Sequence, residues 1–290
     1  MSRHVLVTGG AGFIGSHLVD AYLERGWRVT VVDDLSTGDR SNLNPRATFV
    51  EADIREAPLD QIRPDVINHH AAQMDVRRSV DDPLFDANVN VIGSLALLQK
   101  ASKMGVQRFI FASTGGAIYG EPQFAPQTEQ HPTNPLSPYG CAKLAVEHYL
   151  NYFRVVHGLS TVALRYANVY GPRQNSRGEA GVVAIFIDRL QRGETAIING
   201  DGEQTRDFVY VGDVVAANML VSESSDPGPI NVGTGVETTV NQLAKMIGIH
   251  AEHGPAKAGE QRRSVLGSKF GRTSLADGLR ETLAWFNRSR

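Results

Sequence analysis

Short apolar runs alternate with longer amphipathic stretches along the first 165 residues of the chain. The first run is Val5-Leu6-Val7, an amphipathic stretch follows from about Ser16 to Arg25, and a second run extends from Trp27 to Val32. The same pattern predicts strands near residues 48–51, 65–70, 108–113 and 161–165, and helices near residues 88–104 and 137–157. Repeated alternation of strand and helix is typical of a parallel sheet covered by helices on both faces. The predicted fold class is therefore α/β, with a doubly wound parallel sheet.

The regular alternation stops after Asn168, where turn-forming residues cluster at 171–174, 199–202 and 226–229. This change predicts a sheet domain over residues 1–167 and a smaller, loop-rich substrate domain over residues 168–290, near the carboxyl ends of the strands. Residues 206–211 are predicted to form a strand that returns to the main sheet, with residues 206–232 joining the first domain. Two further helices are expected near residues 239–247 and 274–286, joined by an irregular stretch.

A glycine-rich turn, Thr8-Gly9-Gly10-Ala11-Gly12-Phe13-Ile14-Gly15, follows the first apolar run. Its glycines permit a tight turn, close approach of a pyrophosphate and packing of helix on strand, and the helix N-terminus offers free N–H groups. Asp33 and Asp34 lie about twenty residues further on, where a carboxylate can accept hydrogen bonds from an adenosine ribose; the alternative is a pair of solvated loop aspartates. No Arg follows until Arg40, so a 2′-phosphate would have no partner. The turn predicts a Rossmann fold that binds NAD rather than NADP.

Tyr139 and Lys143 lie four residues apart in the predicted helix 137–157 and therefore share a face. Such a pair can transfer a proton, although a half-buried ring beside a solvated ammonium is the alternative. Ser113 and Thr114 end a predicted strand where a substrate would lie; as isolated residues they are more often turn formers. A phenol needs roughly 4 kcal/mol of stabilisation to lower its pKa from 10 to about 7, which Lys143 and a positive nicotinamide can supply together. We therefore predict Tyr139, Lys143, Thr114 and Ser113 as catalytic residues.

Composition and charge exclude several other classes of protein. The 290 residues are 41% hydrophobic and 21% charged, with a net charge of −2 and no basic stripe, which argues against nucleic acid or an anionic membrane as a partner. The longest apolar stretch, Val182 to Ile187, is far too short to span a bilayer, and no signal peptide pattern precedes the first strand. The single Cys141 agrees with a reducing compartment. We expect a cytoplasmic protein, and we predict no metal site.

The glycine turn, ribose acid, Ser/Thr pair and Tyr-x-x-x-Lys occur in the order and approximate spacing of the extended short-chain dehydrogenase/reductase superfamily. Within it the chain resembles the nucleotide-sugar 4-epimerases of the UDP-glucose (UDP-galactose) 4-epimerase type, from Arg3 to about Asp213 and more loosely to Phe286. The resemblance implies NAD as cofactor, a UDP-sugar as substrate and a homodimer. It also implies that Tyr139, as phenolate, removes the proton of the 4-hydroxyl while hydride passes to NAD, giving a 4-keto sugar that turns over before the hydride returns.

The resemblance also assigns residues to the two ligands. Thr114, with Ser113 in reserve, would hydrogen-bond the 4-oxygen, and Arg206 would grip the diphosphate unless it forms a salt bridge with Asp207 or Asp213. Asp53 could reach the adenine edge or cap a turn. The expected cofactor contacts are Gly9, Gly12, Phe13, Ile14, Gly15, Asp33, Asp34, Leu35, Ser36, Thr37, Gly38, Asp53, Ile54, His70, Ala71, Ala72, Gln73, Asn90, Tyr139, Lys143 and Tyr166. The expected substrate contacts are Thr114, Asn168, Val182, Arg206, Lys257, Glu260 and Ser264.

The chain departs from the family pattern at two places. Residues 257–260, Lys-Ala-Gly-Glu, stand where the family commonly has Arg-Pro-Gly-Asp/Glu, so a bidentate clamp on the diphosphate becomes a point charge unless Arg262 or Arg263 substitutes. Met74 replaces a Lys that some epimerases have.

Ser264 takes the place of a gatekeeper beside the C2 substituent of the sugar, and its small size predicts that N-acetylated sugars enter; the alternative is an ordinary loop residue.

Other functions stay open on the sequence. A nucleotide-sugar 4,6-dehydratase would carry Asp-Glu directly after the Thr, where this chain has Gly115-Gly116. A reductase or decarboxylase of the same superfamily differs only in pocket residues. A non-catalytic dinucleotide sensor would tend to lose Tyr139 or Lys143, and both are present.

Overall fold

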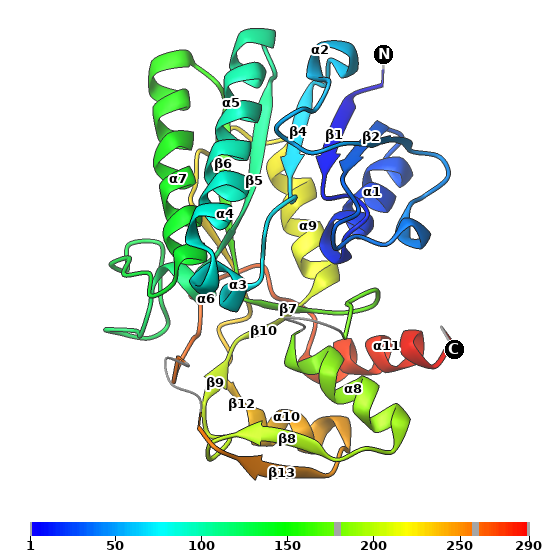
Figure 1. The fold of residues 1–290 in the computed structure, drawn as a ribbon, viewed down its shortest axis with the longest axis vertical. Helices are drawn as coiled ribbons and strands as arrows, with labels where there is room; N and C mark the ends of the chain where they lie inside the picture. The colour runs from blue at the N-terminus through cyan, green and yellow to red at the C-terminus, as the bar shows by residue number, and fades with distance from the viewer. Residues whose placement is uncertain (1, 177–180, 257–260, 289–290) are drawn as a thin grey trace. The chain divides into compact units, whose positions relative to one another are not determined.

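The computed structural model describes residues 2–176, 181–256 and 261–288, and its largest element is a seven-stranded sheet (Figure 1). The strands are β1 (His4–Thr8), β2 (Arg28–Asp33), β3 (Thr48–Glu51), β4 (Val66–His69), β5 (Arg108–Thr114), β6 (Thr161–Tyr166) and β11 (Ile230–Val232). They run in the order β11-β6-β5-β4-β1-β2-β3, and β1 pairs in parallel with both β2 and β4. The strand order therefore reverses at β1, as it does in a doubly wound sheet. The predicted fold class is confirmed.

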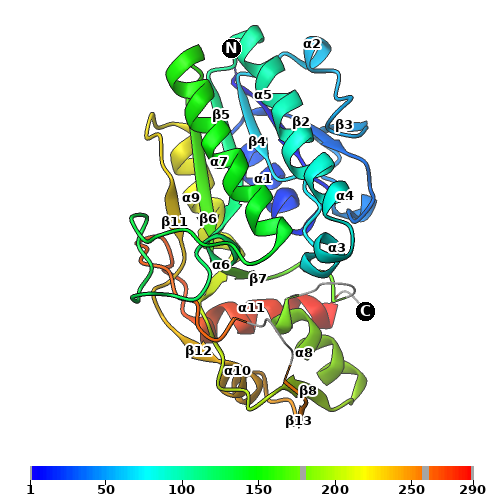
Figure 2. The same ribbon diagram turned by 60° about the vertical axis from the view of Figure 1, so that its left-hand side comes forward.

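Helices cover both faces of this sheet (Figure 2). They are α1 (Phe13–Glu24), α2 (Leu59–Ile62), α3 (Val76–Asp81), α4 (Pro83–Ala87), α5 (Gly93–Met104), α6 (Gly115–Ile118), α7 (Pro138–His157) and α9 (Val211–Ser222). α5 and α7 lie side by side over one face, where Leu97 and Val146 pack against Leu6, Ile67 and Phe109. These strand residues alternate with residues that point to the opposite face, as the two-residue repeat of a strand requires.

The chain divides into two compact units. The first comprises Met1–Ile118, Pro135–Arg165 and Val215–Ile230, and the second comprises Tyr119–Asn134, Tyr166–Val214 and Asn231–Arg290. The second unit contains β7 (Asn168–Tyr170), α8 (Val182–Arg192), β8 (Ala196–Asn199), β9 (Thr205–Arg206), β10 (Phe208–Tyr210), β12 (Thr238–Thr239), α10 (Val240–Ile247), β13 (Ala251–Gly254) and α11 (Leu275–Arg288). Its own core is built around Phe186, Ile187, Ile198 and Leu243. The units interleave along the chain, because the loop 119–134 belongs to the second unit and residues 215–230 belong to the first.

One predicted strand is wrong. Residues 206–211 do not return to the main sheet: β9 pairs with β12, β10 pairs with β7, and the seventh strand of the main sheet is β11. Asp207 separates the two short strands, since its carboxylate is fully buried and accepts hydrogen bonds from the backbone N–H groups of Thr234, Gly235 and Leu266. Because the buried Asp207 interrupts the segment, the residues before it and the residues after it pair with different strands.

The other predicted elements are close to those observed. Both C-terminal helices, α10 and α11, are confirmed, and α10 begins with a capping box formed by Thr239 and Gln242. The helix expected over 88–104 begins with a π-helical turn at Asn88–Ile92 before α5. Among the described residues, no helix is both long and apolar enough to cross a membrane.

Candidate active site

The glycine turn connects β1 to α1 and forms a cradle that side chains would fill. Gly9 has a φ of +71°, and a Cβ atom placed on it would lie 2.6 Å from the backbone nitrogen of Ala71. A Cβ on Gly15 would lie 2.1 Å from the carbonyl oxygen of Gly9. Gly12 is the N-cap of α1 and makes no side-chain cap, so the first N–H groups of the helix, at Phe13 to Gly15, are left for a ligand. This geometry fits a pyrophosphate group.

Asp33 and Asp34, the two predicted ribose acids, have different surroundings. Asp33 is buried at the end of β2, where Oδ2 accepts the N–H of Ala11 at 2.9 Å and Oδ1 accepts the N–H of Leu35 at 2.9 Å. Asp34 is exposed and accepts hydrogen bonds from Ser36. Burial raises the pKa of Asp33, and the two backbone N–H groups oppose that shift. Asp33 is therefore the carboxylate fixed beside the glycine turn.

Asp53, the third acid expected near the cofactor, makes local bonds. Its carboxylate accepts the backbone N–H of Arg55 at 2.8 Å and forms an ion pair with the Arg55 guanidinium at 2.6 Å. These contacts are those of a turn cap, the alternative that the sequence left open. Contact with an adenine edge stays a prediction.

A buried hydrogen-bond network lies beneath the turn at residues 70–73. His69 bonds Thr8 Oγ1 through Nδ1 at 2.7 Å and Ser94 Oγ through Nε2 at 3.0 Å, while the Ser94 hydroxyl donates to the carbonyl of Asn90. Since the Ser94 proton is committed to Asn90, the hydrogen of His69 lies on Nε2 and Nδ1 accepts from Thr8. Burial, with a contribution from the charge of Lys143, holds the pKa of His69 well below its usual range, in agreement with a neutral ring. His69 was not among the site residues predicted from the sequence.

Asn90 and Gln73 use their amides inside the protein. Asn90 is buried; it accepts the N–H of Gln73 at 2.9 Å and donates to the Gln73 carbonyl at 2.8 Å. The Gln73 amide donates to Asp75 and to Asp86. Both residues therefore fix the shape of the 70–73 turn, and direct contact of either amide with a cofactor stays a prediction.

Tyr139 and Lys143 lie one turn apart on α7, as predicted. The helix begins at Pro138 after the N-cap Ser137, whose hydroxyl accepts the N–H of Gly140. Lys143 is buried, and its Nζ donates to the carbonyl oxygen of Ala112 at 2.9 Å and lies 5.7 Å from the centre of the Tyr139 ring. Burial lowers the pKa of Lys143 to about 8. Burial also raises the pKa of Tyr139, so the protein alone keeps the phenol protonated.

Asp86 is a buried carboxylate that was not among the site residues predicted from the sequence. Its Oδ1 accepts hydrogen bonds from Gln73 at 3.0 Å and Asn90 at 2.9 Å, whereas Oδ2 is buried and has no hydrogen-bond partner among the described residues. The negative charge of Asp86 opposes the effect of burial on the pKa of Lys143 and adds to the rise in the pKa of Tyr139. Asp86 therefore favours the ammonium of Lys143 and the neutral phenol of Tyr139.

Ser113 and Thr114 differ in burial, as Asp33 and Asp34 do. Ser113 is buried, and its hydroxyl donates to Glu147 Oε1 at 2.5 Å, whereas Thr114, the last residue of β5, is partly exposed. The single hydroxyl proton of Ser113 is therefore committed to Glu147. This bond engages the Ser113 hydroxyl within the protein. Donation by Thr114 or Ser113 to a substrate oxygen stays a prediction.

Apart from Thr114, which lies in the first unit, the predicted substrate contacts that the structure describes lie in the second unit. Asn168 is exposed at the start of β7, Val182 begins α8 and Ser264 is buried. Arg206 ends β9, and its guanidinium donates to the carbonyl of Thr205 at 2.8 Å. Lys257 and Glu260 lie outside the described residues.

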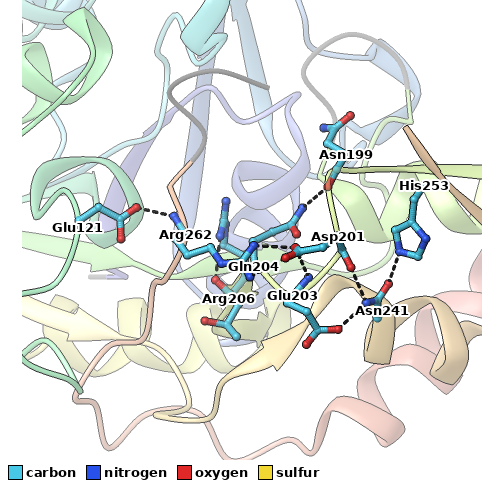
Figure 3. A network of polar contacts seen from close by, with 10 residues as sticks. Glu121, Asn199, Asp201, Glu203, Gln204, Arg206, Asn241, His253 and Arg262 are labelled. Atoms are coloured by element: carbon cyan, nitrogen blue, oxygen red, sulfur yellow. Dashed lines mark hydrogen bonds and ion pairs between the residues drawn. The ribbon is translucent and has the colours of Figure 1, made fainter. Parts of the chain in front are cut away.

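Close to Arg206, a polar network surrounds a cavity of about 210 Å³ in this unit (Figure 3). Arg262 binds both carboxylate oxygens of Asp201, at 2.7 and 2.9 Å, and its backbone N–H donates to Glu121. Asn241 donates to the carbonyl of Asp201 and to Glu203. The cavity is lined by Asn199, Gly200, Asp201, Gln204, Ala256, Gln261 and Arg262.

Arg262 and Arg263, the suggested substitutes for the family clamp, both form ion pairs. Arg262 pairs with Asp201, and Arg263 pairs with Glu237. Asp207 and Asp213, the acids suggested for Arg206, accept backbone N–H groups: those of Thr234 and Gly235 on Asp207, and those of Arg272 and Thr273 on Asp213. A salt bridge of Arg206 with either acid stays an open alternative.

Comparison with known proteins gives consistent matches. The sequence model of the NAD dependent epimerase/dehydratase family matches residues 5–233. A UDP-glucose 4-epimerase from Mycolicibacterium smegmatis is 44% identical over 305 aligned residues, covering 97% of each chain. The crystal structure of UDP-glucose 4-epimerase with UDP-glucose from Thermotoga maritima has a TM-score of 0.97 and 48% identity, covering 99% of each chain. A UDP-N-acetylglucosamine 4-epimerase from Methanobrevibacter ruminantium, in complex with UDP-N-acetylmuramic acid, has a TM-score of 0.94 and 36% identity over 100% of this chain and 99% of that one.

Proposed function

Because the chain belongs to the NAD dependent epimerase/dehydratase family, we propose that it is an isomerase that interconverts UDP-glucose and UDP-galactose at C4 of the sugar. The observation that carries this proposal is the placement of Tyr139 and Lys143 on one face of α7, with the Lys143 ammonium bound to the Ala112 carbonyl near the end of β5. Hydroxyl oxidation and its reversal at one carbon need a proton acceptor and a hydride carrier, and the glycine cradle fits the pyrophosphate of a dinucleotide.

NAD, when bound, supplies a reversible acceptor for the hydride of C4. The N–H groups of Phe13 to Gly15 at the start of α1 would hold its pyrophosphate, and the carboxylate of Asp33 has lone pairs left for the adenosine ribose. The small Gly12 leaves room for the pyrophosphate to approach the backbone.

Tyr139 is the proposed base for the 4-hydroxyl of the sugar. Its pKa is raised by burial in the protein alone, so loss of its proton depends on positive charge close to the ring. The Lys143 ammonium supplies one such charge from a fixed position on the next turn. Thr114 donates a hydrogen bond to the 4-oxygen, and after the 4-keto sugar turns over, Tyr139 returns the proton.

A 4,6-dehydratase is disfavoured at the same site. Elimination of water across C5 and C6 needs an acid and a base next to the sugar. The two positions after Thr114 are Gly115 and Gly116, which begin α6 and have no side chains.

The small side chain of Ser264 supports the proposal that N-acetylated sugars are also substrates. Ser264 is buried in the second unit, where a large side chain would have to displace its neighbours or fill a pocket. A structural neighbour is described as a UDP-N-acetylglucosamine 4-epimerase. We therefore propose that the pocket accepts UDP-N-acetylhexosamines alongside UDP-glucose and UDP-galactose.

We also propose a cytoplasmic homodimer. On α7, Tyr149, Tyr152 and Val156 are exposed, and their spacing places them on one face of the helix. An apolar stripe of this kind on a surface helix suits a self-complementary contact between two copies of the chain. The single Cys141 suits a reducing compartment.

The deciding experiment is to incubate the purified protein with UDP-galactose and follow the sugar signals by NMR. We expect UDP-glucose to appear without net formation of NADH, since the hydride returns to the same sugar in each cycle. Accumulation of NADH would indicate a dehydrogenase, and a 4-keto-6-deoxy product would indicate a dehydratase; either result would overturn the proposal.

A further inference from the structure

Three buried polar side chains, on β5, α7 and β6, meet next to the catalytic pair without taking part in the chemistry described above. Glu147 and Arg165 form an ion pair whose side chains are only 9% and 6% exposed, with Arg165 Nη2 2.6 Å from Glu147 Oε2. Arg165 Nε lies 3.0 Å from Glu147 Oε1, so both carboxylate oxygens are engaged. Ser113 Oγ donates to Glu147 Oε1 at 2.5 Å.

The positions of these residues connect them to the catalytic groups. Glu147 lies four residues after Lys143 and eight after Tyr139, so all three share one face of α7. Ser113 lies between Ala112, whose carbonyl accepts the Lys143 ammonium, and Thr114. Arg165 lies on β6, the strand next to β5 in the sheet.

A buried carboxylate is stable only when its guanidinium partner is held in a fixed geometry. The ion pair between Glu147 and Arg165 is therefore rigid. The planar fork of Arg165 fixes the plane of the Glu147 carboxylate, and this plane sets the direction from which the Ser113 hydroxyl can approach. The β5 backbone at Ser113 is therefore tied to α7 by a charged hydrogen bond, one residue away from the carbonyl that binds Lys143.

We propose that Glu147, Arg165 and Ser113 form a positioning triad for the reaction. The triad fixes β5 against α7, so that the Ala112 carbonyl holds the Lys143 ammonium close to Tyr139 and Thr114 faces the 4-oxygen. Its effect on turnover rests on the proposed epimerase function, whereas its effect on the local backbone does not.

The test compares Ser113→Ala with the matched variant Ser222→Ala. Both serines are buried and each makes a 2.5 Å hydrogen bond to another side chain, Ser113 to Glu147 and Ser222 to Tyr22; Ser222 also donates to the Asn218 carbonyl at 2.7 Å. We expect Ser113→Ala to lower kcat for UDP-galactose about tenfold, with KM changed less than about twofold, because the lost bond orients reacting groups rather than binding substrate. Ser222→Ala should leave kcat unchanged.

The pH profile of kcat is a second measurement. It would not change if the Ser113 hydrogen bond were purely structural. In Ser113→Ala the acid limb should move to higher pH, because a less firmly held ammonium stabilises the Tyr139 phenolate less. Glu147→Gln, which keeps an oxygen acceptor for Ser113, should retain more activity than Glu147→Ala. If Ser113→Ala keeps the wild-type kcat and pH profile and only loses thermal stability, as Ser222→Ala would, the positioning role is refuted.

Amide hydrogen exchange separates this proposal from the proposed function. Measured without substrate, Ser113→Ala should speed exchange in peptides that cover residues 108–118 and 138–148, and Ser222→Ala should not. Failure of the wild-type protein to epimerise UDP-galactose would overturn the proposed function alone. Unchanged exchange at the two peptides would overturn the triad whatever the substrate proves to be.

Discussion

At the scale of single residues, Lys143 is held in an environment that opposes its charge. Burial lowers its pKa from 10.5 to about 8, which means that the folded protein binds the proton less tightly than the unfolded chain does. Below about pH 8 the cost of burying the ammonium is present in full; it shrinks as the pH rises and is gone above pH 10.5. Stability should therefore rise with pH over this window as far as Lys143 is concerned.

Lys143→Met should make the protein more stable and inactive. The pKa difference corresponds to about 3 kcal/mol, and losing the hydrogen bond to Ala112 offsets roughly 1 kcal/mol, so we expect a net gain of about 2 kcal/mol at pH 7. Urea unfolding at pH 7 and pH 9.5 measures the gain and its loss at high pH. The exposed Lys103, changed to Met, is the control. A less stable Lys143→Met at pH 7 would contradict this account.

Tyr139→Phe should lower kcat by at least about a thousandfold while NAD remains bound, because it removes the proton acceptor and almost no volume. Steady-state turnover of saturating UDP-galactose, together with the NAD content of the purified protein, gives both quantities. Tyr149→Phe, on the exposed face of the same helix, serves as the control. Near-normal turnover of Tyr139→Phe would rule out the assigned base.

Ser264→Tyr should lower activity on UDP-N-acetylglucosamine about a hundredfold and change activity on UDP-galactose by less than about fivefold. The reason is that the tyrosine ring fills the space beside the C2 substituent. Ser264 is buried, so Ser264→Ala is needed as a control that keeps the space open. Equal loss of both activities in Ser264→Tyr would show that the residue supports the fold and does not gate the pocket.

At the scale of elements, two glycines of the turn between β1 and α1 are required for different reasons, Gly15 for packing and Gly12 for the approach of a ligand. A Cβ on Gly15 would overlap the Gly9 carbonyl at 2.1 Å, whereas a Cβ on Gly12 would come no closer to the protein than 3.2 Å. We expect Gly15→Ala to lower both the melting temperature and NAD binding. Gly12→Ala should lower the melting temperature less than Gly15→Ala does and bind NAD at least about tenfold more weakly, since its methyl group enters the space for the pyrophosphate. Thermal melts and calorimetric titration with NAD distinguish the two, and unchanged NAD affinity in Gly12→Ala would contradict the cradle.

At the scale of the whole molecule, the apolar stripe on α7 predicts a dimer. Light scattering coupled to gel filtration should give about twice the mass of one chain, and the double variant Tyr149→Glu/Tyr152→Glu should give a monomer, because two charges cannot be buried unpaired in an isologous contact. Leu220→Glu, at another exposed apolar residue, on α9, should remain dimeric. A monomeric wild-type protein would remove the basis for this proposal.

The sequence by itself determined the features that depend on neighbours along the chain. The periods of apolar residues were enough to predict the parallel sheet, and the fixed spacing of Tyr139 and Lys143 was enough to place both on one face of α7. The glycine turn was identified for the same reason, because tight turns limit which residues can stand in them.

Only the tertiary structure decided which of several similar residues faces which environment. Asp33 is buried beside Ala11 while Asp34 is exposed, and Ser113 is bound to Glu147 while Thr114 is partly exposed. Ser113 and Glu147 are 34 residues apart, and Arg165 is 18 residues further on. The partner of a buried polar group is whichever group the packing of strands and helices brings within about 3 Å, and local sequence pattern carries no record of that choice. The same reason explains why residues 206–211 read as one strand yet join two different sheets around the buried Asp207.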